Sequence, residues 1–154
     1  MPNILRASIE INASPEAVRA KFLDFPALPS YSRFFENVDS PKPGTALAPG
    51  DKVSVKIAGS PAFPGRINAN TPEVFTWTGS LPFLFTGAHS FYWTPSQITP
   101  GGTTFVQEET FTGLLGGLYG DGVLAKSAGM KEKTLKGWEG FNEDLKRVVE
   151  AEQR

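Results

Sequence analysis

The sequence predicts an α+β fold in a single domain over residues 1–154, with a curved antiparallel sheet packed on a long final helix. Three observations predict this class. The chain opens with strand-type alternation, residues 42–112 hold short β-type segments separated by turn residues, and residues 130–149 carry an amphipathic stripe. A chain of 154 residues also buries enough surface for one core.

The first strand and the first helix follow directly from the sequence pattern. Residues 4–11 alternate between two faces, as a half-buried strand does. Ser14 is a good helix N-cap, and Pro15 fits the first helical position. The helix then ends before Pro26. Its apolar residues at helical spacing are Val18, Phe22 and Phe25.

A second helix and a set of strands are expected next. The proline-rich stretch PALPSYSRFF predicts a short helix from Ser30 to Phe35, with Ser30 as its cap. Between Lys42 and Thr112 an antiparallel meander is expected, because β-branched and aromatic residues alternate with turn residues there. Its strands are predicted in DKVSVKIAG, RINAN, EVFTWTG, AHSFYW and TTFVQEETF.

The last element is a long amphipathic helix. Apolar residues recur there at spacings of three and four, with Lys, Glu and Arg between them. The residues of this stripe are Met130, Thr134, Trp138, Phe141, Leu145, Val148 and Val149. We expect Trp138 and Phe141 to pack this helix against the sheet.

The composition favours a hydrophobic small molecule as the partner. Acidic and basic residues number 16 and 15 without blocks of one sign, so we expect no nucleic-acid binding. The lack of cysteine and the single histidine argue against a metal site. The glycines of GLLGGLYGDG match no phosphate-binding motif, and we expect no cofactor; they suit a flexible link before the last helix. Without a leader-type start or a membrane-length apolar run, we expect a cytoplasmic protein with no membrane insertion.

Several segments, in their order and spacing, resemble the START-like, or SRPBCC, superfamily. The resemblance is to the branch that contains polyketide cyclases/dehydrases and proteins like one small component of carbon monoxide dehydrogenase. The segments are INASPEAVRAKFLDFPALPSYSRFF, FTWTG, FTGAHSFYW, GTTFVQEETFTGLL and LKGWEGFNEDLKRVVE. The resemblance implies a helix-grip fold, in which a bent sheet wraps the long helix and encloses an apolar cavity. Members include lipid carriers, hormone receptors, aromatic-ring cyclases and cofactor chaperones, so the resemblance leaves the chemistry open.

Strand parity places the only histidine, His89, inside this expected cavity. Residues of one parity share a face, and the bulkier, more apolar set is expected to point inward. The two inward sets are Gly87, His89, Phe91 and Trp93 on one strand and Phe105, Gln107, Glu109 and Phe111 on the next. A hairpin that pairs Phe91 with Gln107 and His89 with Glu109 keeps both sets on one face. His89 and Glu109 then meet inside the cavity.

The candidate ligand-binding residues are mainly aromatic. Nine of the 18 aromatic residues lie between Phe75 and Phe111, which predicts a ring-lined cavity for flat, conjugated or steroid-like molecules. The candidates are Tyr31, Phe34, Phe35, Phe75, Trp77, Phe91, Trp93, Phe105, Gln107 and Tyr119. For each of these rings the alternative is plain core packing.

Two functions are consistent with these residues. One is a cofactor-independent enzyme that cyclises, dehydrates or isomerises a polyketide-like or polycyclic substrate, with His89 and Glu109 as its catalytic acid and base. The other is a non-catalytic carrier of a hydrophobic metabolite or lipid. His89 then either orients the ligand or is a hydrogen-bonded interior residue with no chemical role.

Overall fold

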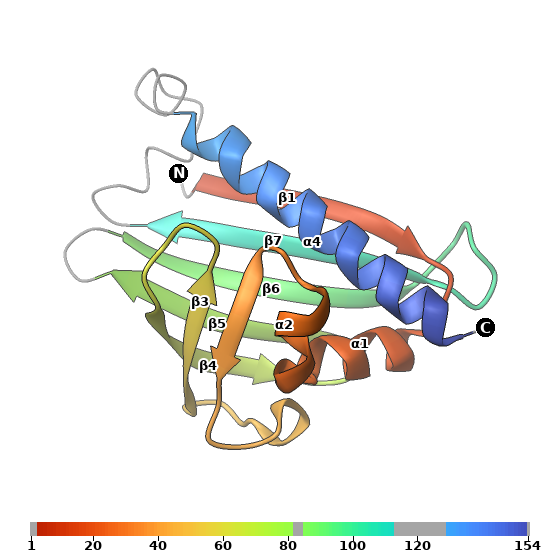
Figure 1. Ribbon diagram of the computed structural model, residues 1–154, viewed down its shortest axis with the longest axis horizontal. Coiled ribbons are helices and arrows are strands. Elements are labelled where there is room, and N and C mark those ends of the chain that lie inside the picture. The colour runs from red at the N-terminus through yellow and green to blue at the C-terminus, as the bar shows by residue number, and fades with distance from the viewer. Residues whose placement is uncertain (1–2, 82–84, 113–128, 154) are drawn as a thin grey trace.

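A computed structural model describes residues 3–81, 85–112 and 129–153 of the chain (Figure 1). Seven antiparallel strands form one sheet in the order β1-β7-β6-β5-β4-β3-β2. The strands are β1 (Asn3–Ile11), β2 (Phe35–Asp39), β3 (Lys52–Ile57), β4 (Phe63–Asn70), β5 (Val74–Leu81), β6 (Phe85–Pro95) and β7 (Thr103–Thr112). The helices are α1 (Pro15–Leu23), α2 (Leu28–Tyr31) and α4 (Met130–Glu152), with 3-10 turns at Phe25–Ala27 and Gly44–Ala46.

The layers match the predicted helix-grip arrangement. The sheet curls into a half-barrel, α4 lies across it, and α1 and α2 cover the end of the sheet near the C-terminus of α4 (Figure 1). The α+β class and the curved antiparallel sheet are therefore confirmed.

Helix α1 begins as its sequence predicts. The Ser14 hydroxyl accepts a hydrogen bond from the Ala17 amide at 3.2 Å, which satisfies one of the free amides at the helix start. The helix buries Val18, Phe22 and Leu23 against the sheet. One face of this short helix thus supplies the core with large apolar side chains.

The predicted helix from Ser30 to Phe35 is wrong in position. A 3-10 turn and α2 occupy residues 25–31, so Ser30 lies inside the helix and its hydroxyl donates to the Ala27 carbonyl at 2.6 Å. Ser32 is already extended, and its hydroxyl accepts from the Phe35 amide at 3.0 Å. Pro26 and Pro29 lack amide hydrogens and fit first-turn positions, which moves the helical residues toward the N-terminus.

Strand β2 was not predicted, because a β-bulge hides its periodicity. The pairing register with β3 shifts between Phe35 and Asn37. The buried residues of the strand are consequently Phe35 and Val38, three apart instead of two. Strand β4 likewise begins earlier than predicted, at Phe63, and pairs through Pro64 and Gly65 with β3.

The predicted register of the central hairpin is confirmed. His89 lies opposite Glu109 and Phe91 lies opposite Gln107 across β6 and β7. Strand β5 continues the same inward face, with Phe75 and Trp77 buried and paired to Phe91 and His89. The candidate polar pair is therefore set on the concave face by backbone pairing alone.

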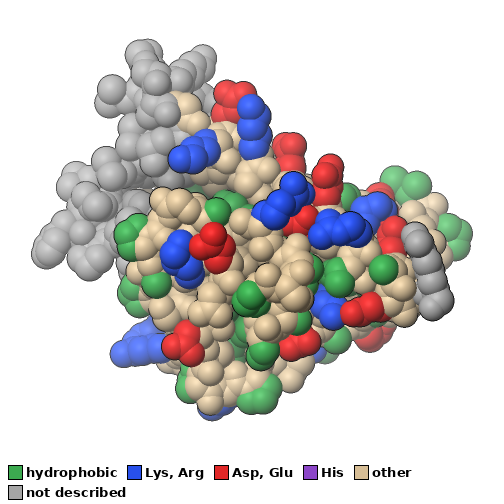
Figure 2. Space-filling view, viewed as in Figure 1, with side chains coloured by type: hydrophobic (Ala, Val, Ile, Leu, Met, Phe, Trp, Pro, Cys, Tyr) green, Lys and Arg blue, Asp and Glu red, His purple; other side chains and the backbone are tan. Residues whose placement is uncertain are grey.

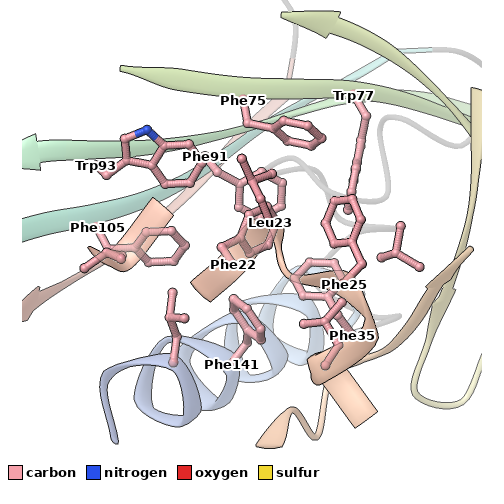
Figure 3. Packing of buried hydrophobic residues seen from close by; sticks show 14 of the residues in the cluster. Phe22, Leu23, Phe25, Phe35, Phe75, Trp77, Phe91, Trp93, Phe105 and Phe141 are labelled. Atoms are coloured by element: carbon pink, nitrogen blue, oxygen red, sulfur yellow. The ribbon is translucent and has the colours of Figure 1, made fainter. Parts of the chain in front are cut away.

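The core centres on Phe22. Its ring lies between the strands that carry Phe75, Phe91 and Trp93 and the helix that carries Phe141 (Figure 3). The Phe22 centroid is 4.4 Å from that of Phe91 and 6.0 Å from that of Phe141. Edge-to-face and tilted pairs of this kind stabilise beyond the area they bury. This end of the half-barrel is filled with rings.

The described surface is mixed in charge. Acidic and basic side chains alternate over α4 on the face shown in Figure 2, and no histidine shows there. None of the helices in the described part of the chain has the length and apolar character needed to cross a membrane.

Candidate functional site: a cavity with a histidine–glutamate pair

A cavity of about 510 Å³ opens between the N-terminal half of α4 and strands β5 to β7. The turn between β3 and β4 closes its far side. Its largest wall residues are Phe34, Phe35, Phe63, Trp77, Phe111 and Trp138. Its polar residues are Ser60, His89, Glu109, Lys133 and Thr134. A mostly apolar wall with a few convergent polar groups is the usual form of a small-molecule site.

The structure brings five of the sequence candidates to this wall. Phe34, Phe35 and Trp77 lie on it together with His89 and Glu109. Trp138, which we expected only to pack the helix on the sheet, also lies on the wall while it is 1% exposed. The expected role of Phe141 in core packing agrees with its complete burial.

The remaining aromatic candidates on the central strands are core residues in this structure. Phe75, Phe91, Trp93 and Phe105 are at most 1% exposed and are absent from the cavity wall. The reason is that the Phe22 ring occupies the space they face, with centroid distances between 4.4 and 6.5 Å. Strand parity gave their direction correctly, but α1 fills that end of the half-barrel.

Tyr31 also lies away from the cavity wall. It is buried, and its ring centroid lies 6.3 Å from that of Phe141. Burial raises the pKa of the Tyr31 hydroxyl, and the carboxylates of Asp24 and Asp144 add to the rise. Tyr119 and the glycine-rich link GLLGGLYGDG lie outside the described residues.

His89 uses both ring nitrogens. Its Nδ1 lies 3.1 Å from Oε1 of Glu109, and its Nε2 lies 3.0 Å from Oε1 of Gln107. The imidazole stacks on Phe91 at 4.2 Å between centroids, and Trp138 covers its other side at 4.7 Å. The side chains of His89 and Glu109 are 5% and 15% exposed. The pair is therefore shielded from bulk water but open to the cavity.

Gln107 continues these contacts to α4. Its Nε2 donates to Oδ1 of Asn142 at 2.7 Å and to the Trp138 carbonyl at 3.4 Å. We call Asn142, Gln107, His89 and Glu109 the polar chain. Three of its four members are at most 4% exposed, and it joins α4 to the two central strands. Buried polar groups that satisfy one another fix a single arrangement of side chains.

Three glycines shape the wall around this chain. A Cβ at residue 87 would overlap the carboxylate of Glu109, and one at residue 79 would lie 2.7 Å from the Phe63 ring. At residue 137 a Cβ would meet the Phe34 ring at 2.5 Å. Each glycine therefore makes room for a side chain that lines the cavity.

Sequence reasoning missed several wall and network residues. Asn142 sits between the apolar residues Phe141 and Leu145 on α4, and a buried polar residue next to an apolar stripe was an available signal. Gly79 and Gly87 lie opposite each other on β5 and β6, a pairing visible only with the register. No three His, Asp or Glu residues in the described ranges are grouped as metal ligands.

A curled sheet around a long helix, with a cavity between them, defines a START-like helix-grip protein. The chain belongs to the family described as polyketide cyclase / dehydrase and lipid transport, whose model matches residues 4–150. No curated protein matches the sequence.

Solved structures share the fold at low sequence identity. A hypothetical protein from Helicobacter pylori is 11% identical with a TM-score of 0.74, covering 96% of this chain and 88% of its own. A START superfamily protein from Mycobacterium smegmatis is 14% identical with a TM-score of 0.68, covering 96% and 97%. A norcoclaurine synthase point mutant from Thalictrum flavum, solved with a transition-state analogue, is 8% identical with a TM-score of 0.69, covering 100% and 98%.

Proposed function

We propose that the protein binds an apolar, ring-containing small molecule in the cavity beneath α4. The cavity itself carries this proposal. Its volume of about 510 Å³ lies within the usual range for small-molecule sites. Phe35, Trp77 and Trp138 offer ring faces and edges against which a flat molecule packs by area burial and offset stacking. Membership in a family of cyclases, dehydrases and lipid-transport proteins supports the same conclusion.

Native mass spectrometry of protein purified from its own host tests this proposal. We expect a bound apolar metabolite, and we expect Thr134→Trp to lose it, because Thr134 lines the cavity and an indole there fills the space. Lys136→Trp is the matched control, since Lys136 is exposed on the same helix. Equal loading of Thr134→Trp and wild type, or no bound metabolite in either, would contradict binding in this cavity.

A second function, cofactor-independent proton transfer to the bound molecule, is favoured by the polar chain. A carboxylate that faces an apolar cavity and touches an imidazole is suited to general acid–base catalysis. In this arrangement Glu109 faces the substrate, while His89 holds the carboxylate in place and balances its charge. Cyclisation and dehydration of a polyketide-like molecule both need such proton transfers.

Kinetics with the metabolite identified by mass spectrometry test the second function. We expect Glu109→Gln and His89→Gln each to lower turnover by about 10²- to 10⁴-fold, the usual contribution of acid–base catalysis. Affinity should stay within about tenfold of wild type, because the lost interaction acts mainly in the transition state. If wild type and both variants release the molecule unchanged, the protein is a carrier.

A further inference from the structure

We propose that the cavity selects ring systems that carry a hydroxyl group, because the polar chain presents Glu109 to the ligand solely as a hydrogen-bond acceptor. This inference rests on the proposed function, that the cavity binds an apolar small molecule. It adds the chemical group by which the site recognises that molecule.

The direction of the polar chain is fixed at a backbone atom. The Trp138 carbonyl oxygen only accepts hydrogen bonds, so the Gln107 group that faces it at 3.4 Å is the amide nitrogen. The same nitrogen donates to Oδ1 of Asn142 at 2.7 Å. The Gln107 carbonyl oxygen therefore points to His89, and it accepts from Nε2 of the imidazole at 3.0 Å.

The proton on Nε2 decides what lies between His89 and Glu109. Nδ1 approaches Oε1 of Glu109 to 3.1 Å, and two lone pairs at that distance repel each other. One proton therefore lies between these atoms, on either Nδ1 or Oε1. In the first state Oε2 belongs to a carboxylate, and in the second it is the carbonyl oxygen of a carboxylic acid. Oε2 accepts a hydrogen bond in both states and donates in neither.

This oxygen faces the cavity without a partner of its own. Oε2 lies where a Cβ of residue 87 would be, and the described residues give Glu109 no hydrogen bond or ion pair other than the one with His89. Nearby wall residues such as Trp77 and Phe111 are apolar. An apolar ligand that leaves a polar atom unpaired in such a site loses affinity, whereas one that donates a hydrogen bond gains it.

A hydroxyl fits better than an ammonium group. The shared proton leaves the His89–Glu109 pair neutral overall, so the site offers no net negative charge to a cation. Lys133 lies on the same cavity wall and repels one. A phenolic or alcoholic hydroxyl supplies the donor without adding charge.

Fluorescence titration with two matched probes, 1-hydroxypyrene and 1-methoxypyrene, tests the inference. Wild-type protein should bind the hydroxyl probe at least about tenfold more tightly, as expected for one hydrogen bond to an ionised acceptor. Glu109→Met keeps the length of the side chain without its acceptor, and it should bring the ratio of the two dissociation constants close to one. A wild-type ratio near one, or a wild-type ratio retained in Glu109→Met, overturns the inference.

A pair of glycine variants repeats the test with the carboxylate still present. Gly87→Ala places a methyl group on the position of Oε2 and should also reduce the ratio. Gly79→Ala is the matched control, because Gly79 lies opposite Gly87 and its Cβ meets Phe63 instead. It should change both affinities alike and keep the ratio. An unchanged ratio in Gly87→Ala, or an equal fall in both variants, contradicts the inference.

The two proposals fail in different ways. Equal binding of both probes by wild-type protein leaves the cavity proposal intact and removes only hydroxyl selection. Failure of wild-type protein to bind either probe contradicts binding of flat ring systems in the cavity, and hydroxyl selection fails with it.

Discussion

Gln107 is the residue on which the arrangement of the site depends. It accepts from His89 and donates to Asn142 and to the Trp138 carbonyl, and it is completely buried. Within the described part of the molecule, the hydrogen bonds that connect α4 to His89 pass through this side chain. The orientation of the imidazole therefore depends on an amide that never reaches the ligand.

Gln107→Leu should lower the free energy of unfolding by about 2–4 kcal/mol. The change leaves Nε2 of His89 and Oδ1 of Asn142 buried without partners, and each unsatisfied group costs about 1–3 kcal/mol. Urea denaturation measures the difference. Gln97→Leu, at an exposed position, is the control and should change stability by less than about 0.5 kcal/mol. Similar small effects of both changes would show that the polar chain is not satisfied as described.

At the scale of elements, α4 is held to the segment after α2 by one buried carboxylate. Asp144 accepts from the Arg33 amide at 3.0 Å, from Nε of Arg33 at 3.1 Å and from Arg147 at 3.1 Å. Burial alone would raise the pKa of Asp144, but these hydrogen bonds outweigh it and the pKa lies below its usual value. The next residue, Phe34, lies on the cavity wall, so this contact also positions part of the site.

This lowered pKa predicts acid sensitivity with a defined sign. The contribution of Asp144 to stability is complete above its unfolded-state pKa of about 3.9 and is lost as the pH falls toward the folded-state pKa. We expect Asp144→Asn to cost about 1–3 kcal/mol at neutral pH, the range for hydrogen bonds to charged groups. Denaturant melts of the two proteins should then converge below about pH 3.9.

Glu139→Gln is the control for this pH series. It changes an exposed carboxyl on the same helix and should leave the gap to wild type small at every pH. A gap between wild type and Asp144→Asn that stays constant from neutral to acid pH would contradict a paired, ionised Asp144.

At the scale of the whole molecule, the half-barrel is divided into a filled end and a hollow end. Strand parity predicted which side chains point inward, and it predicted the register that joins His89 to Glu109. It carried no information on position along the strand relative to α1. Phe22 therefore separates core rings such as Phe91 from wall residues such as Trp77, a contact between elements that no local pattern reveals.

The errors in secondary structure have equally specific causes. Strand β2 escaped detection because its bulge places Phe35 and Val38 three residues apart. The second helix was placed too late because prolines were taken as breakers, whereas Pro26 and Pro29 sit in first turns, where they are tolerated. Asn142 was missed because its role depends on Gln107, a residue 35 positions away that only the tertiary structure brings near.

The glycines of the cavity wall have a consequence for how related proteins diversify. Residues 79, 87 and 137 are positions where one added methyl group pushes against Phe63, Glu109 or Phe34. None of the three belongs to the polar chain, and none is in the core around Phe22. A descendant of this protein therefore gains a new ligand range through single substitutions at these positions, while the residues that keep the domain folded remain as they are.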